Sequence, residues 1–316
     1  MINISIDGIQ LELPAKISII EACKLAGISI PRFCYHESLS VAGNCRMCVI
    51  EVDTIEKPVA SCATEAKSGM DIFTNNAFVK KARENVVETL LINHPLDCPI
   101  CDQAGECDLQ DQTKIYGSSH SRFFYKKKSS EDKECNPLIK TIMTRCITCT
   151  RCVRFSSEVA GKDFFGTLNR GKYTEIGSYT EDLFDSEISG NVVDLCPVGA
   201  LTSGPYSFSG RPWELRMTES IDINDSLGSN IYVNYRENSI YRILPKSNKD
   251  KNDTFISDIA RFAFEHTKTN RLGILQNNYN YNRILLNKKY DTINIIIDEN
   301  CDIKTANFLN NLKNFS

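Results

Sequence analysis

Cysteine is the residue type that gives this 316-residue sequence its chemistry. The chain contains 14 cysteines and only four histidines, and eleven of the cysteines fall into three groups between residues 34 and 196. The chain opens on Met1, Ile2 and Asn3 with no secretory or transit signal, so we expect it to stay in its compartment of synthesis or to have lost a presequence. In a reducing compartment, grouped cysteines predict metal ligation or redox chemistry and not disulfides.

The first group consists of Cys34, Cys45, Cys48 and Cys62, separated by ten, two and thirteen residues. Four thiolates can hold a [2Fe–2S] cluster, although a plant-type site has four residues in the first gap. Gly43 lets the backbone wrap closely around sulfur. The alternative is a four-cysteine zinc site, which usually contains two Cys-x2-Cys pairs, whereas this group contains one. The spacing favours the iron–sulfur cluster.

The second group consists of His94, Cys98, Cys101 and Cys107. Taken alone, three cysteines and one histidine suit a zinc site as well as an iron–sulfur cluster. The position next to the first group favours a [4Fe–4S] cluster with one imidazole ligand. Replacing a thiolate by a neutral imidazole removes negative charge, so by the logic of Rieske centres it should raise the reduction potential.

The third group contains the triplet of a bacterial ferredoxin, made of Cys146, Cys149 and Cys152. In that ferredoxin run a fourth cysteine, followed by proline, comes three residues later. Here Ser156 stands at that position, and the Cys-Pro pair downstream of the triplet is Cys196-Pro197. One triplet and one such cysteine predict a single [4Fe–4S] cluster held by the triplet and Cys196.

The three groups together contain twelve ligands, four for each of three clusters. Cys23 is expected to be a small core residue in the first helix, and Cys135 and Cys301 receive no role.

The elements that must position these ligands change along the chain. Alternating apolar residues at 2–6 and 9–13 around Asp7-Gly8 predict a hairpin, and Ser18 with Glu21 predicts a capped helix that ends at Gly27. Residues 49–52 and 58–61 suit strands of a compact β-grasp unit. Residues 77–93 have helical periodicity up to His94-Pro95. The stretch 95–215 has few apolar periods, so we expect metal binding to supply part of its folding free energy.

After residue 217 the cysteines almost disappear. Residues 231–233 and 240–244 predict a hairpin, residues 258–264 a short helix, and residues 294–297 and 305–312 a strand followed by a helix. From residue 271 onward asparagine, isoleucine and lysine dominate, which is typical of an A+T-rich coding sequence in an organelle or a compact genome.

Composition excludes several functional classes. A net charge of −3 and a pI of about 5.9 argue against a nucleic-acid binder. No run of 18 or more apolar residues exists, so the chain has no membrane span of its own. Neither a phosphate loop nor Gly-x-Gly-x-x-Gly occurs. We therefore expect no nucleotide or flavin site, no substrate-binding site and no catalytic triad.

Beyond the ligands, whole motifs resemble one family. They are HPLDCPICD at 94–102, RCITCTRCVRF at 145–155, NVVDLCPVGALT at 191–202, RPWEL at 211–215 and ESID at 219–222. In this order they resemble the N-terminal part of the largest peripheral-arm subunit of respiratory complex I, the 75-kDa or G-type subunit of NADH:quinone oxidoreductase. The resemblance extends to about Phe264.

The resemblance implies an α+β fold of four parts. These are an N-terminal β-grasp [2Fe–2S] ferredoxin-like domain (1–77), a small helical domain with the histidine-plus-three-cysteine cluster (78–120), a bacterial-ferredoxin-like [4Fe–4S] domain (121–216), and a truncated start of a molybdopterin-oxidoreductase-like domain (217–316). Some bacterial members carry an additional cluster at the start of the last part. Residues 220–232 contain no cysteine, so we expect that cluster to be absent.

The implied function is electron relay within an oxidoreductase, from the flavin of the NADH-binding subunit toward quinone, through one [2Fe–2S] and two [4Fe–4S] clusters. The implied partners are the other peripheral-arm subunits; the missing C-terminal domain is either lost or supplied by a separate chain. The implied location is the matrix side of the mitochondrial inner membrane, or the cytoplasmic face in a bacterium.

Two rival hypotheses remain. A subunit of a NAD-linked or iron-only hydrogenase shares the first two groups, but such chains typically carry two ferredoxin triplets or further cysteines, which Ser156 and the cysteine-poor tail argue against. The other rival is a zinc-stabilised structural or assembly protein.

Overall fold

The computed structural model describes residues 1–178 and 182–267. It divides into two compact units, which are described separately. Unit 1 comprises Met1–Arg216 and Tyr235–Tyr241, and unit 2 comprises Met217–Asn234 and the chain from Arg242 onward. Among the described residues, no helix combines the length and the apolar character that a bilayer crossing requires.

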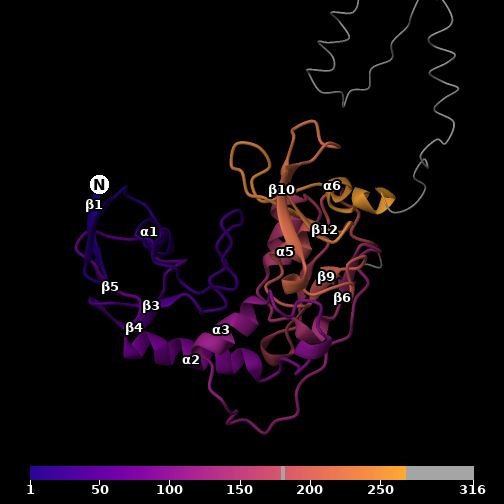
Figure 1. Ribbon diagram of the computed structural model, residues 1–316. Coiled ribbons are helices and arrows are strands. Elements are labelled where there is room, and N and C mark those ends of the chain that lie inside the picture. Colours follow the sequence, from indigo (N-terminus) through magenta and orange to yellow (C-terminus); the bar gives the residue numbers. More distant parts are fainter. Residues whose placement is uncertain (179–181, 268–316) are drawn as a thin grey trace, which may run out of the picture. The chain divides into compact units, whose positions relative to one another are not determined.

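The N-terminal part of unit 1 is a five-stranded mixed sheet with the order β2-β1-β5-β3-β4. Strand β1 (Ile2–Ile6) pairs antiparallel with β2 (Ile9–Leu13) and parallel with β5 (Asp71–Phe73). Strand β3 (Val49–Val52) pairs antiparallel with both β4 (Ile55–Ala60) and β5. Helix α1 (Ile19–Leu25) lies beside this sheet (Figure 1). The predicted hairpin and helix are confirmed.

One apolar core joins this sheet to α1. Ile4, Ile6 and Ile72 of the sheet and Ile19 of the helix are at most 1% exposed. Cys23 belongs to the same core, as predicted, and its burial raises the pKa of its thiol to about 12. A thiol in that environment stays protonated and acts as a small apolar residue.

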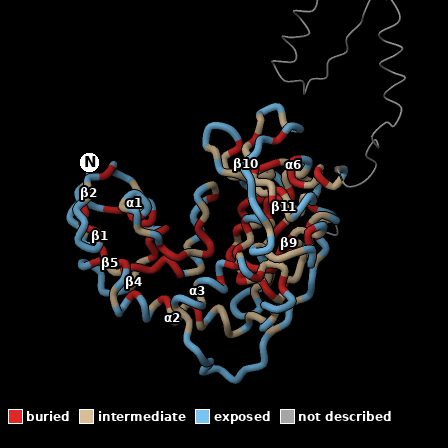
Figure 2. The backbone as a smooth tube through the Cα atoms, viewed as in Figure 1, coloured by how far each residue is buried: buried red, intermediate tan, exposed pale blue. Residues whose placement is uncertain are grey.

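Two helices follow the sheet. Helix α2 (Ala77–Leu91) starts at Asn76, whose side chain accepts a hydrogen bond from the Val79 amide, and α3 (Asp108–Tyr116) packs against it. Lys127 belongs to a segment, 118–127, that is exposed throughout (Figure 2). Its Nζ nonetheless donates to the carbonyls of Leu91 (2.8 Å) and Ile92 (3.2 Å), so it satisfies the free end of α2.

The rest of unit 1 is built from short elements, as its scarce apolar periods predicted. The strands form two small antiparallel sheets, β6 (Ile139–Thr141) with β9 (Leu201–Ser203) and β7 (Gly166–Leu168) with β8 (Glu175–Gly177). The helices are α4 (Arg151–Arg154), the π-helical η3 (Phe155–Val159) and α5 (Asn191–Leu195). Single 3-10 turns lie at η1 (Cys98–Ile100), η2 (Met143–Arg145), η4 (Gly171–Tyr173) and η5 (Pro212–Glu214).

Strands β10 (Arg216–Ile221), β11 (Asn230–Arg236) and β12 (Ser239–Pro245), which lie mostly in unit 2, form a sheet in chain order. Helix α6 (Asp258–Phe262) starts at the capping residue Ser257 and continues into η6 (Ala263–Thr267). The hairpin and the short helix were predicted, whereas β10 was not. The predicted strand at 294–297, the predicted helix at 305–312 and Cys301 lie outside the described residues.

The capping box of α1 gives a test of the N-terminal domain. Ser18 Oγ accepts from the Glu21 amide, and the Glu21 carboxylate accepts from Ser18. Ser18→Ala should destabilise α1 by about 1 kcal/mol, measured as faster amide hydrogen exchange within the helix. Ser68→Ala, at an exposed position of the same domain, is the control. Unchanged exchange in Ser18→Ala would contradict the assigned cap.

Candidate metal centres

The first predicted group converges on a single site next to the N-terminal sheet. Cys34 lies in the loop after α1, Cys45 and Cys48 lie in the loop before β3, and Cys62 follows β4. The Sγ atoms of Cys48 and Cys62 are 3.3 Å apart. The Cys34 amide lies 3.4 Å from the Cys45 Sγ, and the two thiols are hydrogen-bonded to each other. The Cys62 thiol also contacts the Cys34 sulfur, so the four cysteines meet at one site.

Hydrogen bonds among these thiols separate their proton affinities. The Cys34 sulfur accepts from the thiols of Cys45 and Cys62, which lowers the pKa of Cys34. The Cys62 thiol likewise lowers the pKa of Cys48 to about 6. The same bonds, with burial, raise the pKa of Cys45 and of Cys62. Cys34 and Cys48 are thus the sulfurs of this group whose thiolate form, the form that binds metal, is favoured by their neighbours.

Four cysteines that meet at one site fit a [2Fe–2S] cluster, in which four ligands divide between two irons. The loop that carries Cys45 and Cys48 has the conformation this requires. Gly43 has φ +63° and Arg46 has φ +59°, so the backbone turns twice through the left-handed region. That path directs the cysteines of the loop inward, and Cys48 is 1% exposed.

The second predicted group lies where α2, η1 and α3 meet. His94 follows α2, Cys98 begins η1, and Cys107 precedes the first residue of α3. All three line one cavity of about 420 Å³. Cys101 is buried beside Gly199, where a Cβ atom would collide with the Cys101 Sγ. Gly199 therefore leaves the space that the Cys101 sulfur occupies.

The environment of His94 favours the neutral form of its imidazole, which is the form that binds metal. Burial, followed by the positive charge of Lys127, lowers its pKa to about 4. A hydrogen bond with the backbone of Arg145 acts on the ring in the opposite direction. The ring nitrogen Nδ1 is buried without a hydrogen-bond partner. A ligating histidine typically uses one nitrogen for the metal and the other for a backbone carbonyl, so this ring suits a metal ligand better than a surface cap.

The third predicted group lines a small apolar cavity. Cys146, Cys149, Cys152 and Cys196 all face a space of about 20 Å³, together with aliphatic side chains such as Ile147 and Val198. The loop between the cysteines again uses left-handed residues, with φ +51° at Thr148 and +61° at Thr150. The Thr148 amide donates to the Cys146 Sγ (3.3 Å). Ligand set and cradle both fit a [4Fe–4S] cluster.

Burial governs the proton affinity of this third set. It raises the pKa of Cys146 to about 12 and of Cys149 to about 11, and it also raises that of Cys152 and Cys196. These thiols therefore favour their protonated form at neutral pH. A metal that replaces those protons gains the ligands and releases the protons, so this chemistry again suits a metal centre.

Ser156 takes no part in the third site. Its side chain is fully buried, and its hydroxyl donates to the Val153 carbonyl at 2.9 Å. Across residues 1–178 and 182–267, no group of three or more histidine, cysteine or acidic side chains converges closely enough for a single metal ion. A multi-iron cluster spaces its ligand sulfurs more widely, so that finding concerns mononuclear sites only.

The sequence interpretation overlooked three arginines. Arg145, Arg151 and Arg154 lie within or beside the third motif, yet each is less than 10% exposed. The sequence does contain a signal for them: three arginines lie within or beside one cysteine motif, and permanent charges that are buried with such a motif need hydrogen-bond acceptors. Arg145 pairs with Asp97, which directly precedes Cys98, at 3.1 Å. Arg151 and Arg154 contact the loop of the first group.

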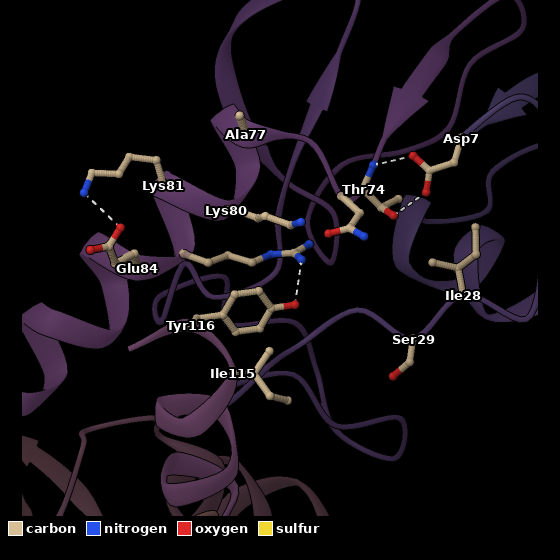
Figure 3. A pocket seen from close by; sticks show the side chains of 12 residues that line it. Asp7, Ile28, Ser29, Thr74, Ala77, Lys80, Lys81, Glu84, Ile115 and Tyr116 are labelled. Atoms are coloured by element: carbon tan, nitrogen blue, oxygen red, sulfur yellow. Dashed lines mark hydrogen bonds and ion pairs between the residues drawn. The ribbon is translucent and has the colours of Figure 1, made fainter. Parts of the chain in front are cut away.

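A polar cavity of about 800 Å³ lies away from the three cysteine groups (Figure 3). Its charges are mostly satisfied by one another: Asp7 accepts from Thr74, and Lys81 pairs with Glu84 at 2.8 Å. The Tyr116 hydroxyl accepts from Arg83 at 3.0 Å. These contacts hold the lining side chains against one another.

Four family models match consecutive stretches of the chain. They are a 2Fe-2S iron-sulfur cluster binding domain (1–77), the NADH-ubiquinone oxidoreductase-G iron-sulfur binding region (83–122), the ferredoxin-like domain of NADH-quinone oxidoreductase subunit 3 (136–202) and an NADH-ubiquinone oxidoreductase NDSU1/NuoG-like 4Fe-4S domain (215–265). The last match covers a stretch that contains no cysteine in this chain.

Similar proteins carry related names. The NADH-ubiquinone oxidoreductase 75 kDa subunit of Reclinomonas americana is 56% identical over 295 residues, which are 93% of this chain and 43% of that protein. The mitochondrial NADH-ubiquinone oxidoreductase 78 kDa subunit of Neurospora crassa is 55% identical over 275 residues, 86% of this chain and 37% of that protein. The G-type NADH-quinone oxidoreductase subunit of Rickettsia typhi is 54% identical over 272 residues, 86% of this chain and 40% of that protein. The chain thus spans about two fifths of the length of these relatives.

A solved structure is also similar. It is a chain of an NAD+-reducing [NiFe]-hydrogenase in the H2-reduced state, with 26% identity and a TM-score of 0.60. The similarity covers 66% of this chain and 90% of that one. The much higher identity to the NADH oxidoreductase subunits makes the hydrogenase hypothesis the weaker one.

The contact at Gly199 gives a test of the second site. Gly199→Ala should displace the Cys101 sulfur, because the new methyl group occupies its position. We expect the purified protein to lose metal from the second site only, measured by metal analysis and spectroscopy. In Gly210→Ala the added Cβ has ordinary contacts of 3.5 Å and more, so that variant should keep its full metal content. Equal metal content in both variants would contradict the placement of Cys101.

Proposed function

The chain belongs to the family of 75-kDa, or G-type, iron–sulfur subunits of NADH:quinone oxidoreductase, and on that premise we propose that it relays electrons from the flavin of a neighbouring subunit toward quinone. The chain is then an electron-transfer part of an oxidoreductase. It performs its task by holding redox groups at fixed positions.

The proposal assigns one [2Fe–2S] and two [4Fe–4S] clusters to twelve ligands. The ligands are Cys34, Cys45, Cys48 and Cys62 for the first; His94, Cys98, Cys101 and Cys107 for the second; and Cys146, Cys149, Cys152 and Cys196 for the third. Support comes from the meeting of the first group's four cysteines at one site, the unpartnered ring nitrogen of His94, and the cavity that all four cysteines of the third group line.

One observation carries the relay function: ligands of all three groups pack in one apolar cluster. Cys34, Cys107 and Cys149 are buried in that cluster with Phe33 and Val87, and cysteines of the first and third groups pack at its margin. Bound clusters would supply one-electron redox chemistry. The side chains between them exclude water and hold the ligands in a rigid medium, which favours transfer with little reorganisation.

Domain boundaries, partners and location follow from the same proposal. We assign domains to residues 1–77, 78–120 and 121–216, and we assign residues 217–316 to the start of a molybdopterin-oxidoreductase-like domain. The flavin- and NADH-binding subunit is the expected electron donor within the peripheral arm of complex I. The matrix face of the mitochondrial inner membrane, or the cytoplasmic face in a bacterium, is the expected location.

A hydrogenase electron-transfer subunit is the second candidate, because its fold similarity covers nine tenths of the hydrogenase chain. The two functions differ in the partner. Purification of the complex from its source separates them: NADH-dependent quinone reduction supports the first candidate, and hydrogen-dependent NAD+ reduction supports the second.

Metal analysis tests the cluster assignment directly. One two-iron and two four-iron clusters predict about ten irons per chain, with brown colour from sulfur-to-iron charge transfer. The measurement is iron, acid-labile sulfide and zinc content of protein purified without oxygen. A colourless protein that contains zinc in place of iron would support the structural alternative and overturn the proposal.

Removal of one ligand tests the third site. Cys149→Ser should lose about four irons and leave residues 140–215 less stable, because metal binding contributes to folding there. Iron content and limited proteolysis measure both effects. Cys135→Ser is the matched control, since Cys135 is equally buried but belongs to none of the three groups. Full iron content and normal protease resistance in Cys149→Ser would contradict the assignment.

A further inference from the structure

Two buried arginines of helix α4 connect the loop of the third cysteine group to the loop of the first. Arg151 is 7% exposed and Arg154 is 9% exposed. Both donate mainly to backbone carbonyls, which carry no full negative charge to compensate the guanidinium. Burying a guanidinium without a full negative charge beside it costs free energy, unless a negatively charged group nearby compensates for it.

Arg151 joins carbonyls that adjoin one ligand from each group. Its Nη1 donates to the carbonyl of Leu195, the residue before Cys196, at 3.0 Å. Its Nη2 donates to the carbonyl of Tyr35, the residue after Cys34, at 2.9 Å. Its Nε is buried without a hydrogen-bond partner. Asp108 is the acidic group that faces it, with the carboxylate oxygen 3.9 Å from Nη1.

Arg154 makes the corresponding contact one turn later. Its Nη2 donates to the carbonyl of the ligand Cys34 at 2.5 Å and lies 3.5 Å from that of the ligand Cys149. Its Nη1 donates to the carbonyl of Ser40, and its Nε lies 3.3 Å from that of Thr150. One guanidinium therefore contacts ligand residues of two groups.

Further contacts link the same two loops. The Asn44 side chain, next to Cys45, donates to the carbonyl of Thr148 at 3.1 Å. Glu158 accepts from the Ser40 amide at 2.9 Å and lies close enough to Arg154 for its pKa to be lowered in part by that charge. The two loops are thus linked at several points, with the arginines at the buried ones.

We infer that Arg151 and Arg154 are positioning residues that fix the separation of the first and third clusters and, through their positive charge, raise the reduction potentials of both. The inference rests on the proposed function. A planar guanidinium suits this role because it holds two carbonyls in a fixed fork and never loses its proton at physiological pH.

The electron balance between these clusters involves the arginines only as fixed charges. Bound clusters would exchange one electron, so that one centre would be oxidised as the other is reduced. No bond to the protein forms or breaks, and no proton is required. The arginines make the separation uniform from molecule to molecule and favour the reduced state of both centres.

Two substitutions at Arg154 separate geometry from charge. Arg154→Lys keeps the charge but loses the fork, and Arg154→Gln also loses the charge. The full chain with reconstituted clusters is compared by pulsed EPR, which reports the magnetic interaction between the reduced first and third clusters, and by redox titration. In both variants, the distribution of this magnetic interaction should be broader than in the wild-type chain. Only Arg154→Gln should lower the potentials, by about tenfold in the one-electron equilibrium, or about 59 mV.

The control is Arg261→Lys, at an equally buried arginine in the cysteine-free stretch 215–265. It should leave both readouts unchanged. Should Arg154→Gln fail to retain its clusters, Arg154→Lys and Arg151→Lys carry the geometric test. Intact clusters with wild-type interaction and potentials in every Arg154 and Arg151 variant would overturn the inference alone. A wild-type chain without clusters would instead overturn the proposed function on which it rests.

Discussion

The raised pKa of a thiol that is removed from water is the constraint on which unit 1 depends. Removal from water raises the pKa of the cysteines in the third group, and a bound metal cation would reverse that effect. The chain around them has short elements and few long apolar periods. On the proposed function, ligand burial and the folding of this region would be coupled, because metal binding would add to the stability of the apolar cluster that shields the sulfurs.

Arginine extends this coupling from one site to the next. A thiolate-ligated cluster carries negative charge into an apolar region, and a buried guanidinium supplies a permanent opposite charge without a titrating group. Arg145 reaches the second group through Asp97, whereas Arg151 and Arg154 reach the first. A ten-residue segment around the third group thus contacts both neighbouring sites, which gives a physical reason for the packing of all three groups in one cluster.

The second site differs from the other two in its exposure. Cys98 is exposed, and the cavity that it shares with His94 and Cys107 is much larger than the closed space of the third site. In the proposed second cluster, a neutral imidazole in place of a thiolate would reduce the negative charge at this more open site. Ligand type and burial therefore vary together, and each provides a way to tune the potential of a centre independently of the others.

Local sequence predicted the N-terminal hairpin, the first two helices and the three candidate ligand groups, because these depend on short-range patterns. Alternation around Asp7-Gly8, the Ser18 capping box and the periodicity of α2 each specify an element within a few residues, and the cysteine spacings specify each group. The tertiary structure alone decided which distant residues meet. The contact of Arg154 with Cys34, of Gly199 with Cys101 and of Lys127 with the end of α2 each joins positions more than 30 residues apart. Such contacts depend on how the loops pack around a shared core, and no local periodicity encodes that packing.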